Sequence, residues 1–283
     1  MARFNYDWSD KKLQQYINEG RGQKSGSEYI PWLNVRTIAS RGRVSRVSGW
    51  KTGRVHHFLS DNELRYFYLC EFSPSVIDIR EHYPLIDLYE MATEILDDEL
   101  LKKLVDSKTG TPHILTSTFL ITTRDAKGKE SYFARNIKEA KDLEKPSIIS
   151  RYESIRRYFE VKGIPWALIT PMEINQVRAK NVEWIHTSFR LSEWGYSEEQ
   201  AEEELMSLVD RMANSRESLR NVFEQFDQEY NRNPGTGLLL FKHLLATKKI
   251  RMDMDKLIDI NQPASIVEIN GFVKGSKAHV SGC

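Results

Sequence analysis

The sequence VHHFLSDNELRYFYLCE, residues 55–71, decides the fold that we expect for the first part of the chain. It predicts one amphipathic helix with a defined start, because Ser60 is a good N-cap residue and Glu63 stands three positions later, where a capping box has its acid. Leu64 and Phe67 then follow at helical spacing. The Ser-x-x-Glu pattern is common, so taken alone it explains Glu63 as a capping residue.

The region after this helix predicts a mixed sheet flanked by helices. Strand-like runs follow at 75–80, 113–124 and 131–138, and a helix at 146–161 and a short strand at 166–170 come next. The polar turn 124–129 predicts a hairpin, and the strand–helix–strand order after it predicts a parallel strand. Residues 86–106 predict a peripheral helical insertion. A helix Glu followed by strands ending in a polar residue and in x-x-Lys is the order of an α/β, restriction-endonuclease-like core, here about residues 55–170.

A second domain is expected after Pro171, because helical patterns dominate from there onward. The expected domains are 1–170, 171–271 and a mobile tail at 272–283 that is rich in Gly, Ser and Lys. Four predicted helices lead to two strand-like runs, at 249–253 and 264–269. This is the order of a winged helix, in a mainly helical domain that could bind protein as readily as DNA.

The charge of the chain is balanced overall but uneven along it. The net charge is +1, whereas residues 1–60 contain eleven Lys or Arg against four acids, a net of +7. A basic N-terminal quarter can follow a phosphate backbone or can be a solvated surface. The candidate DNA contacts lie in the stretch SRGRVSRVSGWKTGR and are Arg41, Arg43, Arg46, Lys51 and Arg54.

The cysteine content and the apolar runs indicate where the protein works. Cys70 and Cys283 are too few for a structural zinc site, and Cys70 on the helix face predicts a buried thiol. We therefore expect a reducing, cytoplasmic compartment. No apolar run approaches the length of a membrane span, and the N-terminus is polar, unlike a signal peptide.

One set of residues has the chemistry of phosphodiester hydrolysis. That reaction needs carboxylates to hold Mg²⁺, and a nearby Lys can orient water or offset developing charge. Glu63 supplies an acid, the strand end Asn136-Ile137-Lys138 supplies an amide and a Lys, and the Ile137 backbone carbonyl can reach a metal. The neighbouring strand, 115–122, contains no acid.

The sequence resembles the TnsA family, the nuclease subunits of heteromeric cut-and-paste transposition systems. The resemblance covers about residues 19–188 and rests on EGRGQ with YIPWL, KTGRVHHFLSD-x-E-L, SVIDIRE-x-YPL, STFLIT, IPW and NVEWI. It implies a Mg²⁺-dependent endonuclease, with Mn²⁺ able to substitute, that cuts the 5′ ends of a transposon. It also implies transposon-end DNA, a TnsB-type transposase and a TnsC-type ATPase as partners, in a bacterial cell and at the nucleoid when assembled.

The sequence departs from the family pattern at one important site position. By the resemblance, Glu63 and Lys138 are catalytic, Asn136 stands in place of the family's Gln, and Thr118 stands where the metal-binding Asp is expected. A neutral hydroxyl is a poorer Mg²⁺ ligand than a carboxylate. Three explanations remain: a naturally weak nuclease, a deliberately inactivated one, or an acid that has moved, with Asp78 and Glu81 as candidates. The alternative function is a cleavage-deficient assembly subunit that bridges TnsB, TnsC and DNA.

Overall fold

The computed structural model describes residues 8–36 and 42–269 of the chain. It divides into two compact units, Met1–Ile174 (unit 1) and Asn175–Cys283 (unit 2). The predictions for Arg41 and for the tail at 272–283 lie outside the described residues. Over the two described ranges, no helix is both long and apolar enough to cross a membrane.

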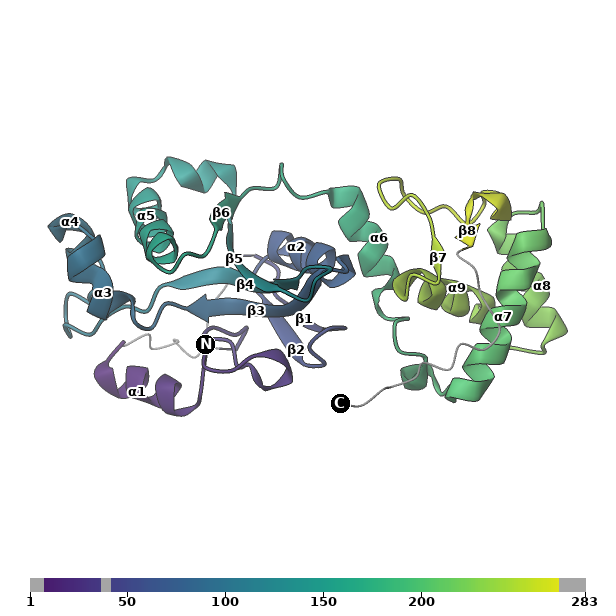
Figure 1. Ribbon diagram of the computed structural model, residues 1–283, viewed down its shortest axis with the longest axis horizontal. Coiled ribbons are helices and arrows are strands. Elements are labelled where there is room, and N and C mark those ends of the chain that lie inside the picture. The colour runs from purple at the N-terminus through teal and green to yellow at the C-terminus, as the bar shows by residue number, and fades with distance from the viewer. Residues whose placement is uncertain (1–7, 37–41, 270–283) are drawn as a thin grey trace, which may run out of the picture. The chain divides into compact units, whose positions relative to one another are not determined.

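Unit 1 is built on a four-stranded mixed sheet (Figure 1). The strands are β3 (Val76–Pro84), β4 (Thr116–Arg124), β5 (Glu130–Ile137) and β6 (Trp166–Ile169), in that order across the sheet. The β3–β4 and β4–β5 pairs are antiparallel and the β5–β6 pair is parallel. This mixed sheet with its flanking helices confirms the α/β prediction for the first part of the chain.

Side chains alternate along β4 and bury different helices on the two faces of the sheet. On one face, the Phe119 ring lies 6.2 Å from Phe58 and 5.7 Å from Tyr66, measured between ring centroids. On the other face, Leu120 belongs to a buried cluster with Ile155 and other side chains. The first face is covered by α2 (Asp61–Phe72) and the hairpin of β1 (Ser45–Ser48) and β2 (Val55–Phe58), and the second by α3 (Leu88–Ile95), α4 (Asp98–Lys102) and α5 (Pro146–Val161).

The predicted N-cap Ser60 is confirmed, but the residues before it do not belong to the helix. Residues 55–58 form strand β2, in which His56 and Phe58 are buried and Val55 is exposed, as alternation in a strand requires. The helix begins at Asp61, and the Ser60 hydroxyl accepts a hydrogen bond from the Glu63 backbone N–H at 3.3 Å. Further along this helix, the thiol of Cys70 is buried as predicted, and burial raises its pKa to about 12.

The segment 86–106 belongs to the core and is not a peripheral insertion. Leu88, Leu96 and Leu100 from this segment are buried against Ile155 and Phe159 of α5. The apolar side chains of α3 and α4 therefore cover part of the sheet.

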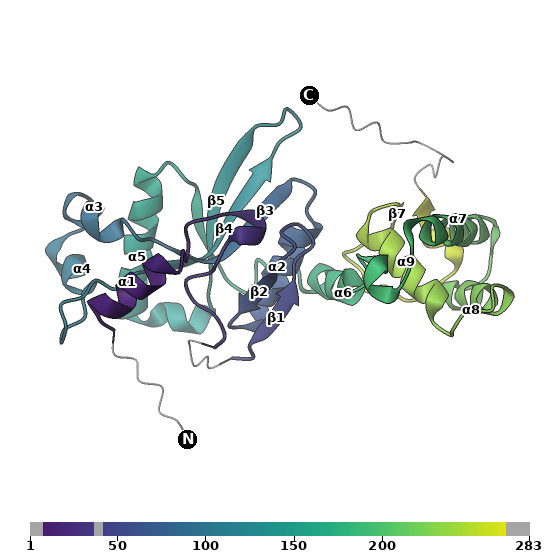
Figure 2. The ribbon, with the colours of Figure 1, turned by 90° about the horizontal axis from the view of Figure 1, so that it is seen from below.

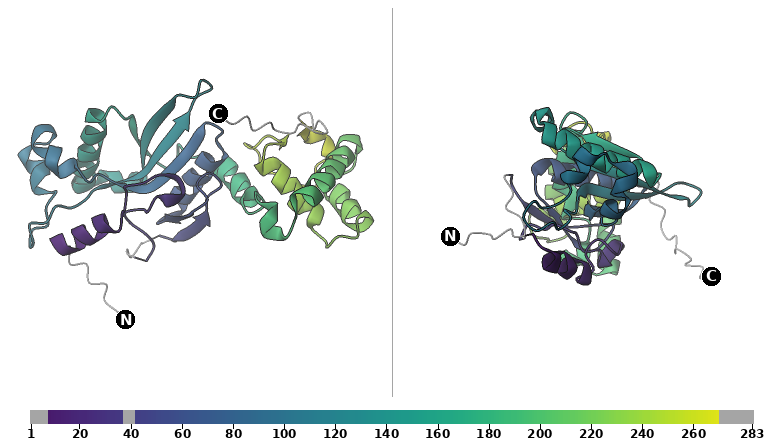
Figure 3. Two further views of the ribbon diagram at one scale, coloured as in Figure 1. Left: turned by 60° about the horizontal axis from the view of Figure 1, so that its bottom comes forward. Right: turned by 90° about the vertical axis from the view of Figure 1, so that its left-hand side faces the viewer.

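Helix α1 (Asp10–Asn18) lies on the opposite side of the sheet from α5, below the strands in Figure 1 and nearer the viewer in Figure 2. The β4–β5 hairpin extends outward to its turn (Figures 2 and 3), where Asp125 accepts from the backbone N–H of Lys127 and Lys129. The short helices η1 (Gly26–Glu28) and η2 (Ala140–Glu144) complete this unit.

Unit 2 is mainly helical, with a core that contains Val182, Leu208, Phe226 and Phe241. Its helices are α6 (Gln176–His186), η3 (Leu191–Trp194), α7 (Glu198–Asn214), α8 (Leu219–Glu229), α9 (Thr236–Ala246) and η4 (Ala264–Ile266). The predicted strands shorten to two residues each, β7 (Ile250–Arg251) and β8 (Glu268–Ile269), which pair antiparallel. A winged helix stays a prediction for this unit.

Candidate active site

The expected site residues line one cleft of unit 1 although they come from three different elements. A cavity of about 730 Å³ is lined by Glu63 at the start of α2, Thr118 of β4, and Asn136, Ile137 and Lys138 at the end of β5. The register explains the grouping, because Leu120 pairs with Ala134 and side chains two residues apart share a face. Thr118, Asn136 and Lys138 therefore start from the same face of the sheet.

The carboxylate of Glu63 has two roles in the local structure. Its Oε2 accepts a hydrogen bond from the Leu59 backbone N–H at 2.7 Å, which fixes the start of α2. The same oxygen lies 4.0 Å from Nε2 of His82, another residue that lines the cleft. His82 has φ of 49°, a backbone conformation that is rare for a residue with a Cβ, and its Nε2 lies 3.0 Å from the His57 carbonyl oxygen.

Thr118 and Asn136 are held in place by hydrogen bonds inside the sheet. The Thr118 hydroxyl accepts from the Ile137 backbone N–H at 3.1 Å. The Asn136 amide oxygen accepts from the Trp166 indole N–H at 2.8 Å, and its NH₂ group donates to the Thr116 carbonyl at 3.4 Å. Both side chains are buried, so these bonds restrict them to one orientation.

Lys138 is paired with an acid that the sequence analysis did not single out. Its ammonium lies 3.1 Å from Oδ2 of Asp142, and Oδ1 of the same carboxylate lies 2.8 Å from the Lys145 ammonium. Hydrogen bonds from Lys145 and Lys138 lower the pKa of Asp142 to about 2. Lys141 and Arg151 line the same cleft. The sequence signal for these charged groups is the mixture of lysines and acids in EAKDLEK, residues 139–145.

At Thr118 the cleft lacks the carboxylate that the family pattern leads one to expect as a Mg²⁺ ligand. Glu63 faces a hydroxyl at Thr118 where a second carboxylate is needed. Within residues 8–36 and 42–269, no group of three or more His, Cys, Asp or Glu side chains is placed to hold a metal ion. The cleft as it stands offers the Glu63 carboxylate beside the Thr118 hydroxyl and the Asn136 amide, and two further carboxylates, Glu139 and Asp142, among its cations.

Comparisons with known proteins agree along most of the chain. The family described as TnsA-like endonuclease N terminal matches residues 73–171, and the family described as TnsA endonuclease C terminal matches residues 173–254. The chain is 34% identical over 271 residues to the Transposon Tn7 transposition protein TnsA of Escherichia coli, covering 94% of each chain. The chain belongs to the TnsA-like endonuclease family.

Neither candidate for a moved acid reaches the cleft of this TnsA-family chain. Glu81 is fully buried, with its carboxylate 2.8 Å from both an Arg54 guanidinium nitrogen and Nδ1 of His56. Asp78 accepts from the backbone N–H of Gly26 at 3.2 Å and lies beside the Arg80 guanidinium. Both carboxylates are committed to structural contacts, and neither lines the cavity that contains Glu63.

Fewer of the candidate DNA contacts of the TnsA-family chain are available to a phosphate than the sequence predicts. Arg54 is buried and its guanidinium bonds to Glu81 and to the Ile79 carbonyl, so it is not available to a phosphate. The Lys51 ammonium donates to the Ser73 carbonyl at 2.9 Å, and burial lowers the pKa of Lys51. Arg43, with a side chain that is 73% exposed, and Arg46 on β1 keep exposed positions.

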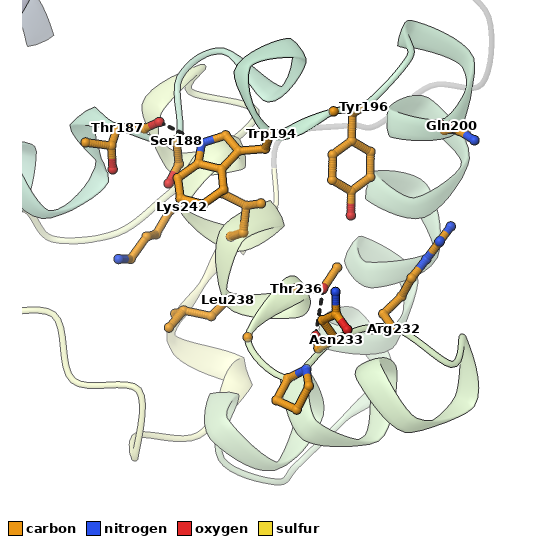
Figure 4. A pocket seen from close by; sticks show the side chains of 14 residues that line it. Thr187, Ser188, Trp194, Tyr196, Gln200, Arg232, Asn233, Thr236, Leu238 and Lys242 are labelled. Carbon is orange, nitrogen blue, oxygen red and sulfur yellow. Dashed lines mark hydrogen bonds between the residues drawn. The ribbon is translucent and has the colours of Figure 1, made fainter.

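A second cavity, of about 520 Å³, lies within unit 2 (Figure 4). Its wall includes Trp194, whose indole N–H donates to the Thr187 carbonyl at 3.0 Å, and Lys242, whose ammonium lies 4.1 Å from the Trp184 ring centroid. Among the described residues, the cavity is lined by cations, aromatic and polar side chains and by no acid, His or Cys. The unit 1 cleft, which contains Glu63, is therefore the candidate active site of the TnsA-family chain.

Proposed function

We propose that this chain is the TnsA-type subunit of a transposition system and binds transposon-end DNA in the unit 1 cleft. The observation that supports this is the meeting of Glu63, Thr118, Asn136 and Lys138 in one cavity. Family membership supports a TnsB-type transposase and a TnsC-type ATPase as its partners. In this proposal the chain acts on the 5′ ends of the transposon.

The hydrolytic activity is proposed to be weak in this chain because Thr118 replaces a charged ligand. A complete site of this kind would use Mg²⁺ or Mn²⁺ to activate water. In such a site, Glu63 and the Ile137 carbonyl would be the oxygen donors to the metal ion. Asn136 would be the amide beside them, and Lys138 would offset charge that develops in the transition state. Loss of one charge-stabilising group costs about 100-fold or more in rate.

A second candidate function is assembly without cleavage. The bond from the Ile137 N–H to the Thr118 hydroxyl favours it, because the position is filled by a neutral group with a structural contact. Such a subunit would bridge TnsB-type and TnsC-type partners and DNA. Transposition would then leave the 5′ strands attached and produce cointegrates.

The substitution Thr118→Asp tests the cleft directly. We expect this variant to nick the 5′ strand of a labelled transposon-end duplex about 100-fold faster than the parent chain. The assay contains the TnsB-type and TnsC-type partners, ATP and Mg²⁺. Thr123→Asp is the matched control, because Thr123 lies on the same strand, outside the cleft lining.

The outcomes separate the candidate functions. Faster nicking by Thr118→Asp that is lost again in Thr118→Asp/Glu63→Gln supports the cleft and the weak activity of the parent. Efficient nicking by the parent chain would overturn the weak-activity proposal and the assembly function together. No nicking by either form, with all partners present, would sink the assignment of this cleft to cleavage.

A further inference from the structure

The carboxylate of Asp142 lies between two lysine ammonium groups on the wall of the cleft. Oδ2 is 3.1 Å from Nζ of Lys138 and Oδ1 is 2.8 Å from Nζ of Lys145, so each carboxylate oxygen forms one ion pair. The Asp142 side chain is 24% exposed and that of Lys145 is 57% exposed. The three charged groups therefore meet at a surface that solvent can reach.

The chain brings these groups together through its local structure. Lys138 directly follows the last residue of β5, Asp142 lies in η2, and Lys145 immediately precedes α5. All three line the cavity that also contains Glu63, and Lys141 and Arg151 add positive charge and Glu139 negative charge to the same cavity. The three residues therefore line the proposed DNA cleft together.

An anion held by two lysine ammonium groups has the chemistry of a bound phosphate. Lysine acts as a point charge for phosphate oxygens, and charge-assisted hydrogen bonds to such oxygens are stronger than neutral ones. In the free protein, the ammonium groups of Lys138 and Lys145 donate to one carboxylate that lies between them. A backbone phosphate carries the same charge and more acceptor oxygens.

We propose that Lys138 and Lys145 form a subsite for a backbone phosphate of the DNA strand, which Asp142 occupies when DNA is absent. This inference deepens the proposed function and rests on it, because it needs DNA to enter this cleft. Asp142 then competes with DNA and weakens non-specific binding. Entry of the strand exchanges the carboxylate for a phosphate.

The exchange is feasible because water reaches both ion pairs, with the Lys138 side chain 32% and that of Asp142 24% exposed. Exposed ion pairs are weak, since water and salt screen them. The pairs are also local, three and four residues apart, so Asp142 can leave them without disturbing the sheet. A buried pair such as Arg54 with Glu81 could not be exchanged in this way.

The test measures DNA affinity of the full chain as a function of salt. The probe is a labelled duplex of random sequence, and its Kd is followed by fluorescence anisotropy from about 50 to about 200 mM salt. We expect Asp142→Asn to bind several-fold more tightly at low salt than the parent. We also expect its plot of log Kd against log salt to steepen by about one, because the entering phosphate displaces salt anions from the two lysines in the variant and the Asp142 carboxylate in the parent.

The matched control is Glu144→Gln, which changes the net charge equally in the same short helix but outside the cleft lining. It is expected to leave affinity and slope close to those of the parent. In Lys145→Ala, the added effect of Asp142→Asn is expected to shrink, because the phosphate has lost one of its two cations. Thermal melts of all variants check that they are folded.

Two results would overturn the inference, and they differ in what else they affect. If Asp142→Asn and Glu144→Gln change the Kd and its salt dependence equally, the effect is one of net charge alone. The proposed function would then stand. A DNA affinity that does not change in Lys138→Ala or in Lys145→Ala would show that DNA does not bind in this cleft. In that case the proposed function and the subsite would both fail.

Discussion

Glu81 is a buried carboxylate that holds the β1–β2 hairpin against strand β3. Burial opposes its ionisation, but the charge of His56 and the hydrogen bonds from Arg54 outweigh burial and hold the pKa of Glu81 well below its usual value. The backbone N–H of His57 donates to the same carboxylate at 3.1 Å. One side chain therefore ties strand β3 to the hairpin.

This contact predicts a pH-dependent stability. Because the folded pKa lies below the ordinary value of 4.5, the stabilisation is complete above that pH and is lost as the pH falls below it. We expect Glu81→Gln to lower the free energy of unfolding by about 3–5 kcal/mol near neutral pH, since it leaves Arg54 buried without a counter-charge. The difference from the parent is expected to narrow in acid, as measured by urea unfolding across pH.

Glu160→Gln provides the control for this measurement, because Glu160 is an exposed acid on α5 with a side chain that is 66% exposed. It is expected to change the free energy of unfolding by less than about 1 kcal/mol. A Glu81→Gln penalty that stays constant from neutral to acid pH would contradict the role given to this carboxylate.

At the scale of single residues, the sequence predicted which side chains line the cleft but not which charged side chains form ion pairs. Glu63, Asn136 and Lys138 could be grouped in advance because the hairpin and the helix order constrain them, whereas Thr118 was added to the group only by the family resemblance. Arg54 was expected on the surface and is buried, because its partner lies 27 residues away in the chain. No local pattern encodes such a pairing.

At the scale of elements, the start of α2 combines a cap with a site residue. The Ser60 hydroxyl accepts from the Glu63 N–H, and the Glu63 carboxylate accepts from the Leu59 N–H. We expect Ser60→Ala to lower the free energy of unfolding by about 1 kcal/mol, through loss of the cap. Glu63→Gln keeps an acceptor oxygen and is expected to preserve stability, whereas Glu63→Ala does not.

Chemical denaturation checks these values, with Ser107→Ala, an exposed serine in a turn, as the control. The three variants at the helix start separate the capping role of Glu63 from its proposed chemical role. Loss of stability in Glu63→Gln equal to that in Glu63→Ala would show that the negative charge itself is needed for the fold.

Elements were predictable where periodicity extends over enough residues. The strands of the hairpin and helix α5 have clear alternation or helical spacing and were found within a few residues. The four residues of β2 are too few to separate a strand from a helix start, and their pairing with β1 decides it. The core role of 86–106 depends on α5, about 50 residues later, which that segment alone does not reveal.

At the scale of the whole molecule, each unit has its own buried core. Phe159 belongs to the cluster of unit 1, and Phe226 lies in unit 2 with its ring 4.7 Å from that of Tyr230. Both phenylalanine side chains have no exposed surface, which makes them matched probes. The change of composition after Pro171 signalled two domains from sequence, but only the structure gives separate cores.

Calorimetry of the full chain is therefore expected to show two unfolding transitions, one for each core. Phe159→Ala removes the same volume from unit 1 that Phe226→Ala removes from unit 2, at a cost of about 3–5 kcal/mol to the core concerned. Each substitution is expected to lower the midpoint of one transition and leave the other in place. A single transition that both variants lower equally would show that the two cores unfold as one cooperative unit, and separate stabilities could not then be assigned to them.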